Sequence, residues 1–565
     1  MDASDALVFG ATGFIGRALV AELLGRGQRV AAAVRNDDAL TPWLTSQGVD
    51  TGGLTVVAAD ITQPLSGLPE VRDVYNTAAR FAFGLGVEEA RATNVTGALH
   101  VLEWAASLPA LRRLVHLSGY RVSASDGRPD YGELGAYEAS KIEADLAVRA
   151  RARALDVPLT IANPSTVIGP GQYIGLAALV EGLWNGRLRA LPGGPDTFLP
   201  IVTLDYFARF LAEIPASPAG EHHWVLDDTT PLLPELIRTI ADHTGVRAPT
   251  RTLPVGLLRR LPRKVTRADP ETLSFLSADR YPTASARAVA AAAGLEMPPA
   301  ADALRAWADD LVATRFGAAS PWLRPYGFHT VAGSRTWVNG ERYRPAHVLL
   351  HGLPMNADLW APLAARLAGP VLAPDLPGLG RSAASAAQLD TWLAELLSPV
   401  RTRPALVAHS LACGPALRFA VEHPERISGL VLVSPAFLQA PGPRATRSVL
   451  AVPTLRRMSA ARLAGLLGLP EGPEVASAAA DLRRPGVAHR VITALRTASA
   501  EREQYRALLD RVDVPVQIVV GSADPPAAAG DHQVTEIAGA GHYPQLTHPA
   551  EVAHHLGAAS APLGG

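Results

Sequence analysis

The chain has a single cysteine and no long hydrophobic run. Cys413 is alone among 565 residues, which excludes an internal disulfide framework. No stretch approaches the roughly 20 uninterrupted apolar residues of a membrane-spanning helix. The opening MDASDALVFG lacks the basic and apolar regions of a signal peptide. We therefore expect a cytoplasmic protein without a transmembrane segment.

An excess of charge of either sign is also missing. The 52 Lys and Arg residues meet 53 Asp and Glu residues, so the formal net charge is −1 and no global field recruits nucleic acid. The chain is longer than the roughly 300 residues at which single cores stop growing, so two or three domains are expected. Small-molecule substrates are the expected partners, and homo-oligomerisation is left open.

The first half of the sequence alternates short β-branched runs with longer helical stretches. This alternation predicts an α/β fold with a doubly wound parallel sheet. The stretch from about 165 to 318 is less regular, should face the substrate, and ends in an expected helix over 303–316. The expected strands are 6–10, 29–34, 54–60, 74–79, 114–119 and 159–164.

A second α/β unit follows a break at 317–327, where Gly, Ser and two prolines interrupt any helix. We expect a first domain over 1–318, a linker over 319–327 and a second domain over 328–565, with a helical cap at about 437–508. The second domain should contain a hairpin and five further strands, over 329–340, 347–352, 371–375, 405–410, 429–435 and 516–522.

A glycine-rich loop, GATGFIG at 10–16, lies between the first expected strand and a helix with an apolar face. In a dinucleotide-binding unit Gly10 permits the tight turn, Gly13 lets the backbone approach the pyrophosphate, and Gly16 allows close helix packing. The N-terminus of the helix adds aligned N–H groups and a positive dipole for the phosphates. Glycine is common in turns of any kind, but this context predicts a dinucleotide site.

The second expected strand ends in Val34 and Arg35, with no acid where one would hold an unmodified adenosine ribose. Arg35 can pair with a 2′-phosphate instead, which favours NADP over NAD. Asp37 and Asp38 lie close by, so NAD stays an alternative. Asp60, at the end of the third strand, is placed either to touch the adenine amine or to cap a helix.

The sequence YEASK at 137–141 places Tyr137 and Lys141 one helical turn apart on the same face. A tyrosine, with an ordinary pKa near ~10, needs nearby positive charge to exchange protons at neutral pH. Lys141 and an oxidised nicotinamide supply that charge, so Tyr137 is a candidate general acid/base. The alternative, an exposed helix that happens to carry Tyr and Lys, is disfavoured by the upstream glycine-rich loop.

Over about residues 5–315 the sequence resembles the extended short-chain dehydrogenase/reductases, an NAD-dependent epimerase/dehydratase-like family. Further matches are NTAA at 76–79, Asn94, PSTVIGPG at 164–171 and PIVTLDYFARF at 200–210. The resemblance implies a Rossmann fold, Tyr137 and Lys141 as the catalytic pair, and Asn94 in the proton relay. It also implies cofactor contacts from Gly10, Thr12, Gly13, Phe14, Ile15, Gly16, Arg35, Asp60, Ala78, Lys141 and Pro164.

One departure from this family concerns the hydroxyl that binds the substrate carbonyl. The family usually has Ser or Thr three residues before the valine of the loop after the fifth strand. Counting back from Val122, that place is Gly119. Ser118 can take over the hydrogen bond, Ser123 can substitute, or the site lacks this donor. Ser118 is our candidate.

The sequence AHSLA at 408–412 follows an expected buried strand and precedes a helix, which is the setting of a nucleophile elbow at Ser410. The glycines that usually flank the nucleophile are here Ala408 and Ala412. Alanine is the next smallest residue, so the close approach of strand and helix at the elbow stays feasible.

A nucleophilic serine needs a base, an acid that orients the base, and donors for the oxyanion. His542 is the expected base and Asp524, just after a strand, the expected acid. The order Ser410, Asp524, His542 is that of α/β-hydrolases. Asp513 is a poorer acid because it lies before that strand, at its opposite end.

Two further motifs, HGLP at 351–354 and DLPGLGRS at 375–382, complete a resemblance to serine α/β-hydrolases over about residues 328–560. The resemblance implies esterase-like chemistry beneath a cap. The oxyanion would meet the backbone N–H groups of Leu353 and Leu411, since Pro354 has none to donate.

The other histidines add no metal site. His548, His554 and His555 surround the last expected helix, but no Cys or acidic partner recurs at ligand spacing, so no metal is expected. His351 and His409 are interpreted as structural. Cys413 is interpreted as a small packing residue.

These patterns predict a bifunctional enzyme. The first domain would reduce a ketone or acyl thioester with NADPH, and the second would hydrolyse an ester or thioester through Ser410. Two alternatives stay open. One is a single-activity serine hydrolase with a nucleotide-binding regulatory domain. The other is an NAD-dependent epimerase or dehydratase fused to a hydrolase.

Overall fold

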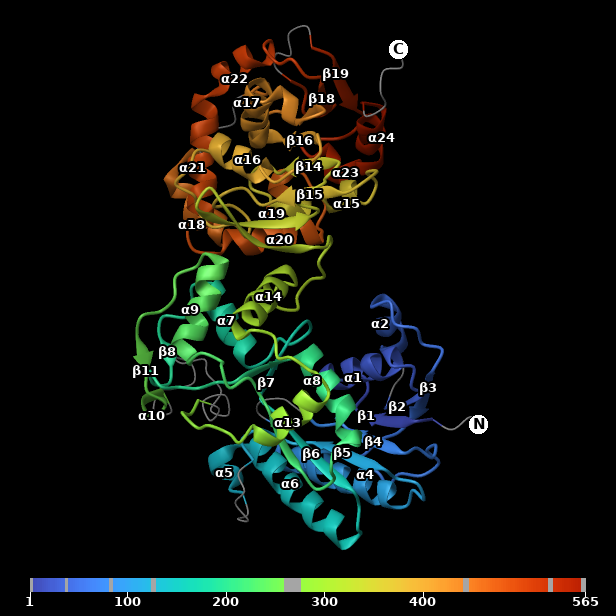
Figure 1. Cartoon of the computed structure of the whole chain (residues 1–565). Coiled ribbons are helices and arrows are strands. Elements are labelled where there is room, and N and C mark those ends of the chain that lie inside the picture. The colour runs from blue at the N-terminus through green and yellow to red at the C-terminus, as the bar shows by residue number, and fades with distance from the viewer. Residues whose placement is uncertain are drawn as a thin grey trace. The chain divides into compact units, whose positions relative to one another are not determined.

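The computed structural model describes residues 4–35, 39–80, 85–122, 129–258, 276–440, 447–526 and 532–559. The chain divides into two compact units. The first gathers residues 1–178, 189–239 and 249–307, and the second 179–188, 240–248 and 308–565. Each unit is built around one large sheet (Figure 1) and is described by itself.

The sheet of the first unit has seven parallel strands in the order β10-β6-β5-β4-β1-β2-β3. The strand order reverses between β1 and β4, and doubly wound sheets bind ligands at the carboxyl edge beside such a switch point. The predicted fold is confirmed, with one added edge strand, β10 (His222–Val225). The other strands are β1 (Ala6–Phe9), β2 (Val30–Val34), β3 (Leu54–Ala58), β4 (Asp73–Asn76), β5 (Arg113–Leu117) and β6 (Leu159–Pro164).

Helices cover both faces of this sheet (Figure 1). On one face lie α1 (Phe14–Gly25) and α8 (Leu204–Glu213), and on the other lie α4 (Gly97–Ala106) and α6 (Ala136–Ala154). Because both faces are covered, β1 and β2 are buried along their whole length and read as continuous apolar runs. Further helices of this half of the sequence are α2 (Leu40–Ser46), α3 (Val87–Arg91), α7 (Leu176–Trp184), α9 (Leu233–Thr244), α13 (Ala284–Ala292) and α14 (Ala300–Ala313).

The second unit contains a mixed eight-stranded sheet in the order β12-β13-β15-β14-β16-β17-β18-β19. The hairpin of β12 and β13 is antiparallel, β13 joins β15 antiparallel, and the remaining pairs are parallel. This is the predicted α/β-hydrolase arrangement, extended by β19. The strands are β12 (Tyr326–Val331), β13 (Ser334–Gly340), β14 (His347–Leu350), β15 (Val371–Pro374), β16 (Ala405–His409), β17 (Gly429–Val433), β18 (Val516–Gly521) and β19 (Val534–Ile537).

The segment between β17 and β18 is helical, as predicted for the cap. Its helices alternate with turns at glycine and proline, and each buries one face, for example Leu463 and Ala464 of α19. The cap helices are α18 (Val452–Arg456), α19 (Ala460–Leu467), α20 (Pro473–Leu482), α21 (Val487–Ala500) and α22 (Arg502–Leu509). The hydrophobic core of the second unit also includes the buried residues of α16 (Leu389–Leu397) and α17 (Cys413–Glu422).

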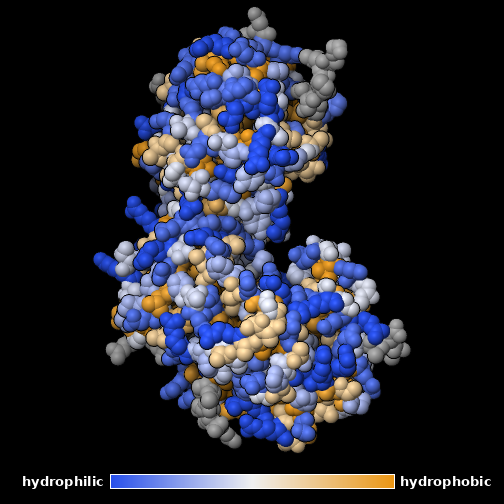
Figure 2. Space-filling model, in the orientation of Figure 1, coloured by the Kyte–Doolittle hydropathy of each residue, from blue (hydrophilic) through white to orange (hydrophobic). Residues whose placement is uncertain are grey.

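No helix in the described ranges is long and apolar enough to cross a membrane. On the face shown in Figure 2, hydrophilic and apolar residues are mixed in small areas. Most large apolar side chains of each unit lie between its sheet and its helices. The burial that stabilises each unit is therefore internal to it.

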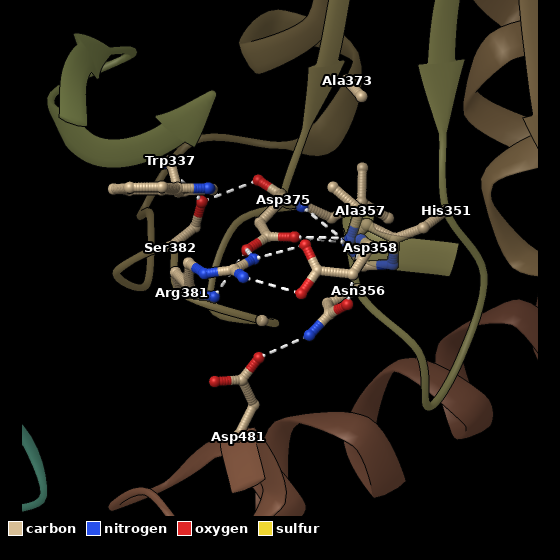
Figure 3. A network of polar contacts seen from close by, with 12 residues as sticks. Trp337, His351, Asn356, Ala357, Asp358, Ala373, Asp375, Arg381, Ser382 and Asp481 are labelled. Carbon is tan, nitrogen blue, oxygen red and sulfur yellow. Dashed lines mark hydrogen bonds and ion pairs between the residues drawn. The ribbon is translucent and has the colours of Figure 1, made fainter. Parts of the chain in front are cut away.

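A buried charge network lies where the loops after β14 and β15 meet (Figure 3). The Arg381 guanidinium donates to both carboxylate oxygens of Asp358, at 3.0 and 2.7 Å, and the Arg381 N–H donates to Asp375 Oδ2 at 2.7 Å. Burial by itself would raise the pKa of Asp358, but Arg381 and Arg315 outweigh it and hold that pKa well below its ordinary value. Asp358 is therefore an anion inside the core.

The same network reaches the cap. Asp481 on α20 accepts a hydrogen bond from Asn356 Nδ2 at 2.7 Å, as Figure 3 shows. It also forms a two-bond ion pair with Arg315, at 2.5 and 2.9 Å. The cap helix is thus joined to the loop after β14 through a buried hydrogen bond between the Asn356 amide and the Asp481 carboxylate.

Substitution of Arg381 tests this network. Arg381→Met should destabilise the second unit by about 3–5 kcal/mol, because Asp358 and Asp375 lose a charged donor while staying buried. The thermal unfolding transition, followed by circular dichroism, measures the effect. The matched control is Arg366→Met at an exposed arginine that bonds only a carbonyl of its own turn, where a change within about 0.5 kcal/mol is expected. Equal midpoints for the two variants would contradict the prediction.

Candidate active sites

The glycine-rich loop of the first unit lies at the switch point between β1 and β4. Gly10 has φ +76°, and an added Cβ there would lie 2.7 Å from the backbone of Ala78. A Cβ on Gly16 would come within 2.1 Å of the Gly10 carbonyl oxygen and 2.7 Å of Thr77 Oγ1. Gly13 is the N-cap residue of α1. Gly10 and Gly16 therefore have no room for a side chain. The loop leads into the N-terminus of a 12-residue helix, which suits a pyrophosphate.

Arg35 is exposed directly after β2, and Asp60 follows β3. The pKa of Asp60 lies below its ordinary value, first because its carboxylate accepts hydrogen bonds from the N–H and hydroxyl of Thr62, and to a smaller extent because Arg35 attracts it. Asp60 thus caps a turn in this structure. Asp37 and Asp38 lie outside the described residues. The remaining predicted cofactor contacts lie in the glycine-rich loop, at the start of α1 and at the end of β6: Thr12, Phe14, Ile15 and Pro164.

The predicted catalytic pair of the first unit lies near the start of α6. Tyr137 is half-buried, and Lys141 is buried with its Nζ donating to the Leu117 carbonyl at 2.7 Å. Burial lowers the pKa of Lys141 to about 8, against a smaller opposing attraction from Asp145. Lys141 therefore carries its charge below about pH 8 and loses it above.

Asn94 lies in a π-helical turn, Ala92–Thr96, a distortion that is frequent at functional sites. Its Nδ2 donates to Ser140 Oγ at 2.9 Å, and its Oδ1 accepts from the Arg80 N–H at 2.8 Å. Ser140 Oγ in turn donates to the Tyr137 carbonyl at 2.8 Å. Asn94 thus fastens the first turn of α6, which carries Tyr137, to the loop after β4.

Ser118 continues the ladder between β5 and β6, since its N–H donates to the Ala162 carbonyl at 2.9 Å. Its hydroxyl is buried and meets no hydrogen-bond partner among the described residues. An added Cβ on Gly119 would meet only Val122, at 3.8 Å, so space does not exclude a side chain there. Ser118 thus keeps a free donor beside the place where the family's hydroxyl is missing. Ser123 lies outside the described residues.

A buried polar pair beside Lys141 was not predicted. Asn76 Oδ1 accepts from the Ala78 N–H at 3.2 Å, so Asn76 Nδ2 faces His116 Nδ1, also at 3.2 Å. His116 therefore carries its proton on Nε2. Burial, with a smaller contribution from Lys141, lowers the pKa of His116 to about 3 and keeps the ring neutral. A histidine inside the buried strand RLVHL is the sequence signal for this pair.

The three predicted triad side chains of the second unit lie together. Ser410 Oγ is 2.9 Å from His542 Nε2, and His542 Nδ1 is 2.7 Å from Asp524 Oδ2. Asp524, and not Asp513, is the acid at this histidine. With the Nδ1 proton donated to the carboxylate, Nε2 is free to accept the serine proton. The arrangement can therefore activate a serine for attack on an acyl carbon.

The elbow around Ser410 depends on small residues. Ser410 has φ +53°, a strained value for a residue with a side chain. Ala408 and Ala412 are fully buried, so alanine fits at both places where glycine is usual. Gly352 of HGLP also has no room for a side chain, because an added Cβ would lie 2.7 Å from Ser410 Cβ.

The two predicted oxyanion donors border the same serine. Leu411 follows it in the 3₁₀ turn Ser410–Ala412, and Leu353 lies in the loop after β14. The Tyr543 hydroxyl donates to the Leu353 carbonyl at 3.0 Å and so joins that loop to the loop of His542. His409 Nε2 donates to the His542 carbonyl at 2.9 Å, which is a structural contact.

The remaining candidate groups of the second unit also have structural contacts. His351 Nδ1 donates to the Gly352 carbonyl at 3.0 Å, and its Nε2 accepts from the Leu376 N–H at 2.9 Å. The Cys413 thiol points to the Ala408 carbonyl at 3.2 Å, and burial raises its pKa. In the described part of the chain, no three His, Cys, Asp or Glu side chains are grouped to hold a metal ion.

One side chain at the triad was missed by sequence reasoning. Gln439, buried in the loop after β17, donates from Nε2 to Asp524 Oδ2 and lies 3.1 Å from His542 Nδ1. No motif marks it, because its contact with Asp524 spans 85 residues of sequence.

Three known proteins show what the two halves are similar to. A pimeloyl-[acyl-carrier protein] methyl ester esterase of Aromatoleum aromaticum is 31% identical over 250 residues, 37% of this chain and 96% of that protein. A ketoreductase of Stigmatella aurantiaca that acts on a farnesyl dihydroquinoline oxide is 24% identical over 273 residues, 45% of this chain and 77% of that protein. The structure of a UDP-glucuronic acid 4-epimerase from Bacillus cereus is 16% identical, covers 54% of this chain and 98% of its own, and has a TM-score of 0.43.

Family models divide the sequence in the same way as the two sites. Residues 6–184, which contain the glycine-rich loop and the Tyr137–Lys141 pair, match the NAD dependent epimerase/dehydratase family. Residues 348–555, which contain Ser410, Asp524 and His542, match the alpha/beta hydrolase family. The chain is therefore an N-terminal NAD-dependent epimerase/dehydratase domain fused to a C-terminal alpha/beta hydrolase domain.

Proposed function

We propose that the chain is a bifunctional enzyme whose domains, 1–318 and 328–565, are an NADPH-dependent reductase and a serine hydrolase with a cap at about 437–508. The reductase would act on a ketone or an acyl thioester, and the hydrolase on an ester or thioester. The observation that carries the proposal is the unbroken set of contacts from Ser410 through His542 to Asp524. The similarity to a methyl ester esterase supports an ester substrate for this half.

In the proposed hydrolysis, Ser410 Oγ attacks the acyl carbon while His542 Nε2 accepts the hydroxyl proton. Asp524 holds the imidazole in the required tautomer and stabilises its positive charge. The N–H groups of Leu353 and Leu411 donate to the oxyanion. His542 then returns the proton to the leaving alcohol or thiol. Water, activated by the same histidine, attacks the acyl-serine, releases the acid and restores Ser410.

In the proposed reduction, a bound nicotinamide dinucleotide supplies the hydride. Gly10, Gly13 and Gly16 give its pyrophosphate room at the N-terminus of α1. Tyr137 donates its hydroxyl proton to the carbonyl oxygen, and the charge of Lys141 makes that tyrosine a better acid. The hydroxyl of Ser118, which has no hydrogen-bond partner among the described residues, donates a hydrogen bond to the same oxygen and takes the role left open at Gly119.

The cofactor is proposed to be NADP because exposed Arg35 can pair with a 2′-phosphate. The matching family is described as NAD-dependent, which favours a second candidate, an epimerase or dehydratase that keeps NAD bound. The similarity to a ketoreductase supports reduction. Two observations together would decide for the second candidate. The purified protein would retain bound nucleotide, and no carbonyl compound would cause net oxidation of added NADPH.

The hydrolase proposal predicts the behaviour of two variants. Ser410→Ala should lower p-nitrophenyl ester hydrolysis at least about 10³-fold, because the nucleophile is gone. Tyr137→Phe should leave hydrolysis unchanged, because it alters only the other site. Release of p-nitrophenol by the full chain measures both. Hydrolysis by Ser410→Ala at the wild-type rate would show that Ser410 is not the nucleophile.

The dinucleotide proposal predicts different effects at two glycines of α1. Gly16→Ala should weaken NADPH binding at least about 10-fold, because its Cβ would press on the Gly10 carbonyl oxygen at 2.1 Å and displace the loop. Gly25→Ala, where a Cβ meets nothing within 4 Å, should bind as the wild type does. Fluorescence titration with NADPH and with NADH measures both variants and the cofactor preference. The proposal fails if neither nucleotide binds the wild-type chain.

The reduction should depend on pH through Lys141. Burial has lowered the pKa of Lys141 to about 8, so its charge is present below that pH and disappears above it. The rate of NADPH oxidation with a carbonyl substrate should therefore fall as pH rises through about 8. A flat pH profile up to pH 10 would remove Lys141 from this role.

Ser118→Ala should lower the rate of NADPH oxidation about 10–100-fold at every pH, because it removes one hydrogen-bond donor to the substrate oxygen.

A further inference from the structure

Gln439 touches the acid of the triad and not the nucleophile. Its Nε2 donates to the oxygen of Asp524 that also accepts the His542 Nδ1 proton. The 3.1 Å approach of the same amide nitrogen to Nδ1 cannot be a second hydrogen bond while Nδ1 carries that proton. An amide turned the other way would place its oxygen against the carboxylate, so the observed orientation is the favourable one.

The other groups that face His542 are uncharged. The His409 ring lies 5.0 Å away, and burial lowers the pKa of His409 so that it is neutral. The Tyr543 ring lies 5.1 Å away, and burial raises the pKa of Tyr543, so its hydroxyl keeps its proton. Among the described residues, the carboxylate of Asp524 is thus the charged group in contact with His542.

The backbone just before Gln439 is hydrogen-bonded to α22 (Arg502–Leu509). The Phe437 carbonyl, two residues earlier, accepts a hydrogen bond from Arg506 Nε at 2.9 Å and lies 3.5 Å from Arg502 Nη2. Both arginines are on α22. The hydrogen bond donated to Asp524 therefore comes from a segment whose backbone is bonded to α22.

We propose that Gln439 is a positioning residue of the triad that, through Asp524, lowers the proton affinity of His542 and fixes the orientation of its acid. A donor on the carboxylate withdraws part of the negative charge that would otherwise stabilise the imidazolium. The inference rests on the proposed hydrolysis only in that Ser410, His542 and Asp524 act as a triad.

Two variants and two controls test this role. Gln439→Leu removes the donor, so the acid limb of the pH profile of kcat/KM should move up by about 0.5–1 unit, and kcat should fall about 3–30-fold with KM nearly unchanged. Gln439→Glu adds a second carboxylate and should move the limb further than Leu does. Gln388→Leu and Gln388→Glu, at an exposed glutamine whose side chain caps nothing, should keep the wild-type limb.

The protonation of His542 is also measured without turnover. Proton–carbon NMR of ring-labelled histidine, with the His542 signal assigned by His542→Gln, should give a pKa that rises in the order wild type, Leu, Glu. The same His542 pKa in all three proteins would overturn the inference, whether or not any ester is hydrolysed. If Gln439→Leu does not fold, the Glu variant, of nearly the same size, decides. Failure of the wild type to hydrolyse any ester would instead count against the proposed function.

Discussion

The buried pairing of Arg381 with Asp358 and Asp375 is the constraint on which the geometry of the second unit depends. Asp375 Oδ1 accepts the Ala357 N–H at 2.7 Å, so the loop after β14 is held by a carboxylate that Arg381 keeps in place. That loop carries Leu353. Replacing such a cluster by apolar residues often costs little, whereas removing one member costs much. We infer that the contribution of the network is to define one arrangement of loop and cap.

Both units place their reactive groups by the same rule. In a parallel sheet the carboxyl ends of neighbouring strands share an edge, and residues that follow different strands meet there. Gly10 follows β1, Ala78 follows β4 and Ser118 follows β5. In the second sheet, Ser410 follows β16 and Asp524 follows β18. Chain segments approach each other closely at these edges, so an added side chain at Gly16 or Gly352 would collide with its neighbours.

The fold could be predicted from the sequence because strands covered on both faces read as apolar runs. The two added strands, β10 and β19, lie at sheet edges and contain polar residues, as in HHWV and VTEI, so no hydrophobic run marks them. The triad residues could be predicted because each lies in a short sequence motif and the motifs follow in the order of α/β-hydrolases. Gln439 and the Asn76–His116 pair could not, since each contact exists only after distant segments have packed. At Asp60, a capping role and an adenine contact fit the same motif, and the structure shows the capping bond.

The two proposed reactions make opposite demands on proton affinity within one chain. The proposed reduction needs a charged Lys141. Because burial lowers the pKa of Lys141 to about 8, this charge is lost above about pH 8. Hydrolysis needs His542 neutral, and the carboxylate of Asp524 works against this by stabilising the imidazolium. In the role proposed for Gln439, its amide donates to that carboxylate and opposes this stabilisation. We infer that the burial of Lys141 and the amide at Asp524 are two adjustments of proton affinity, made in separate units, that suit the two proposed chemistries.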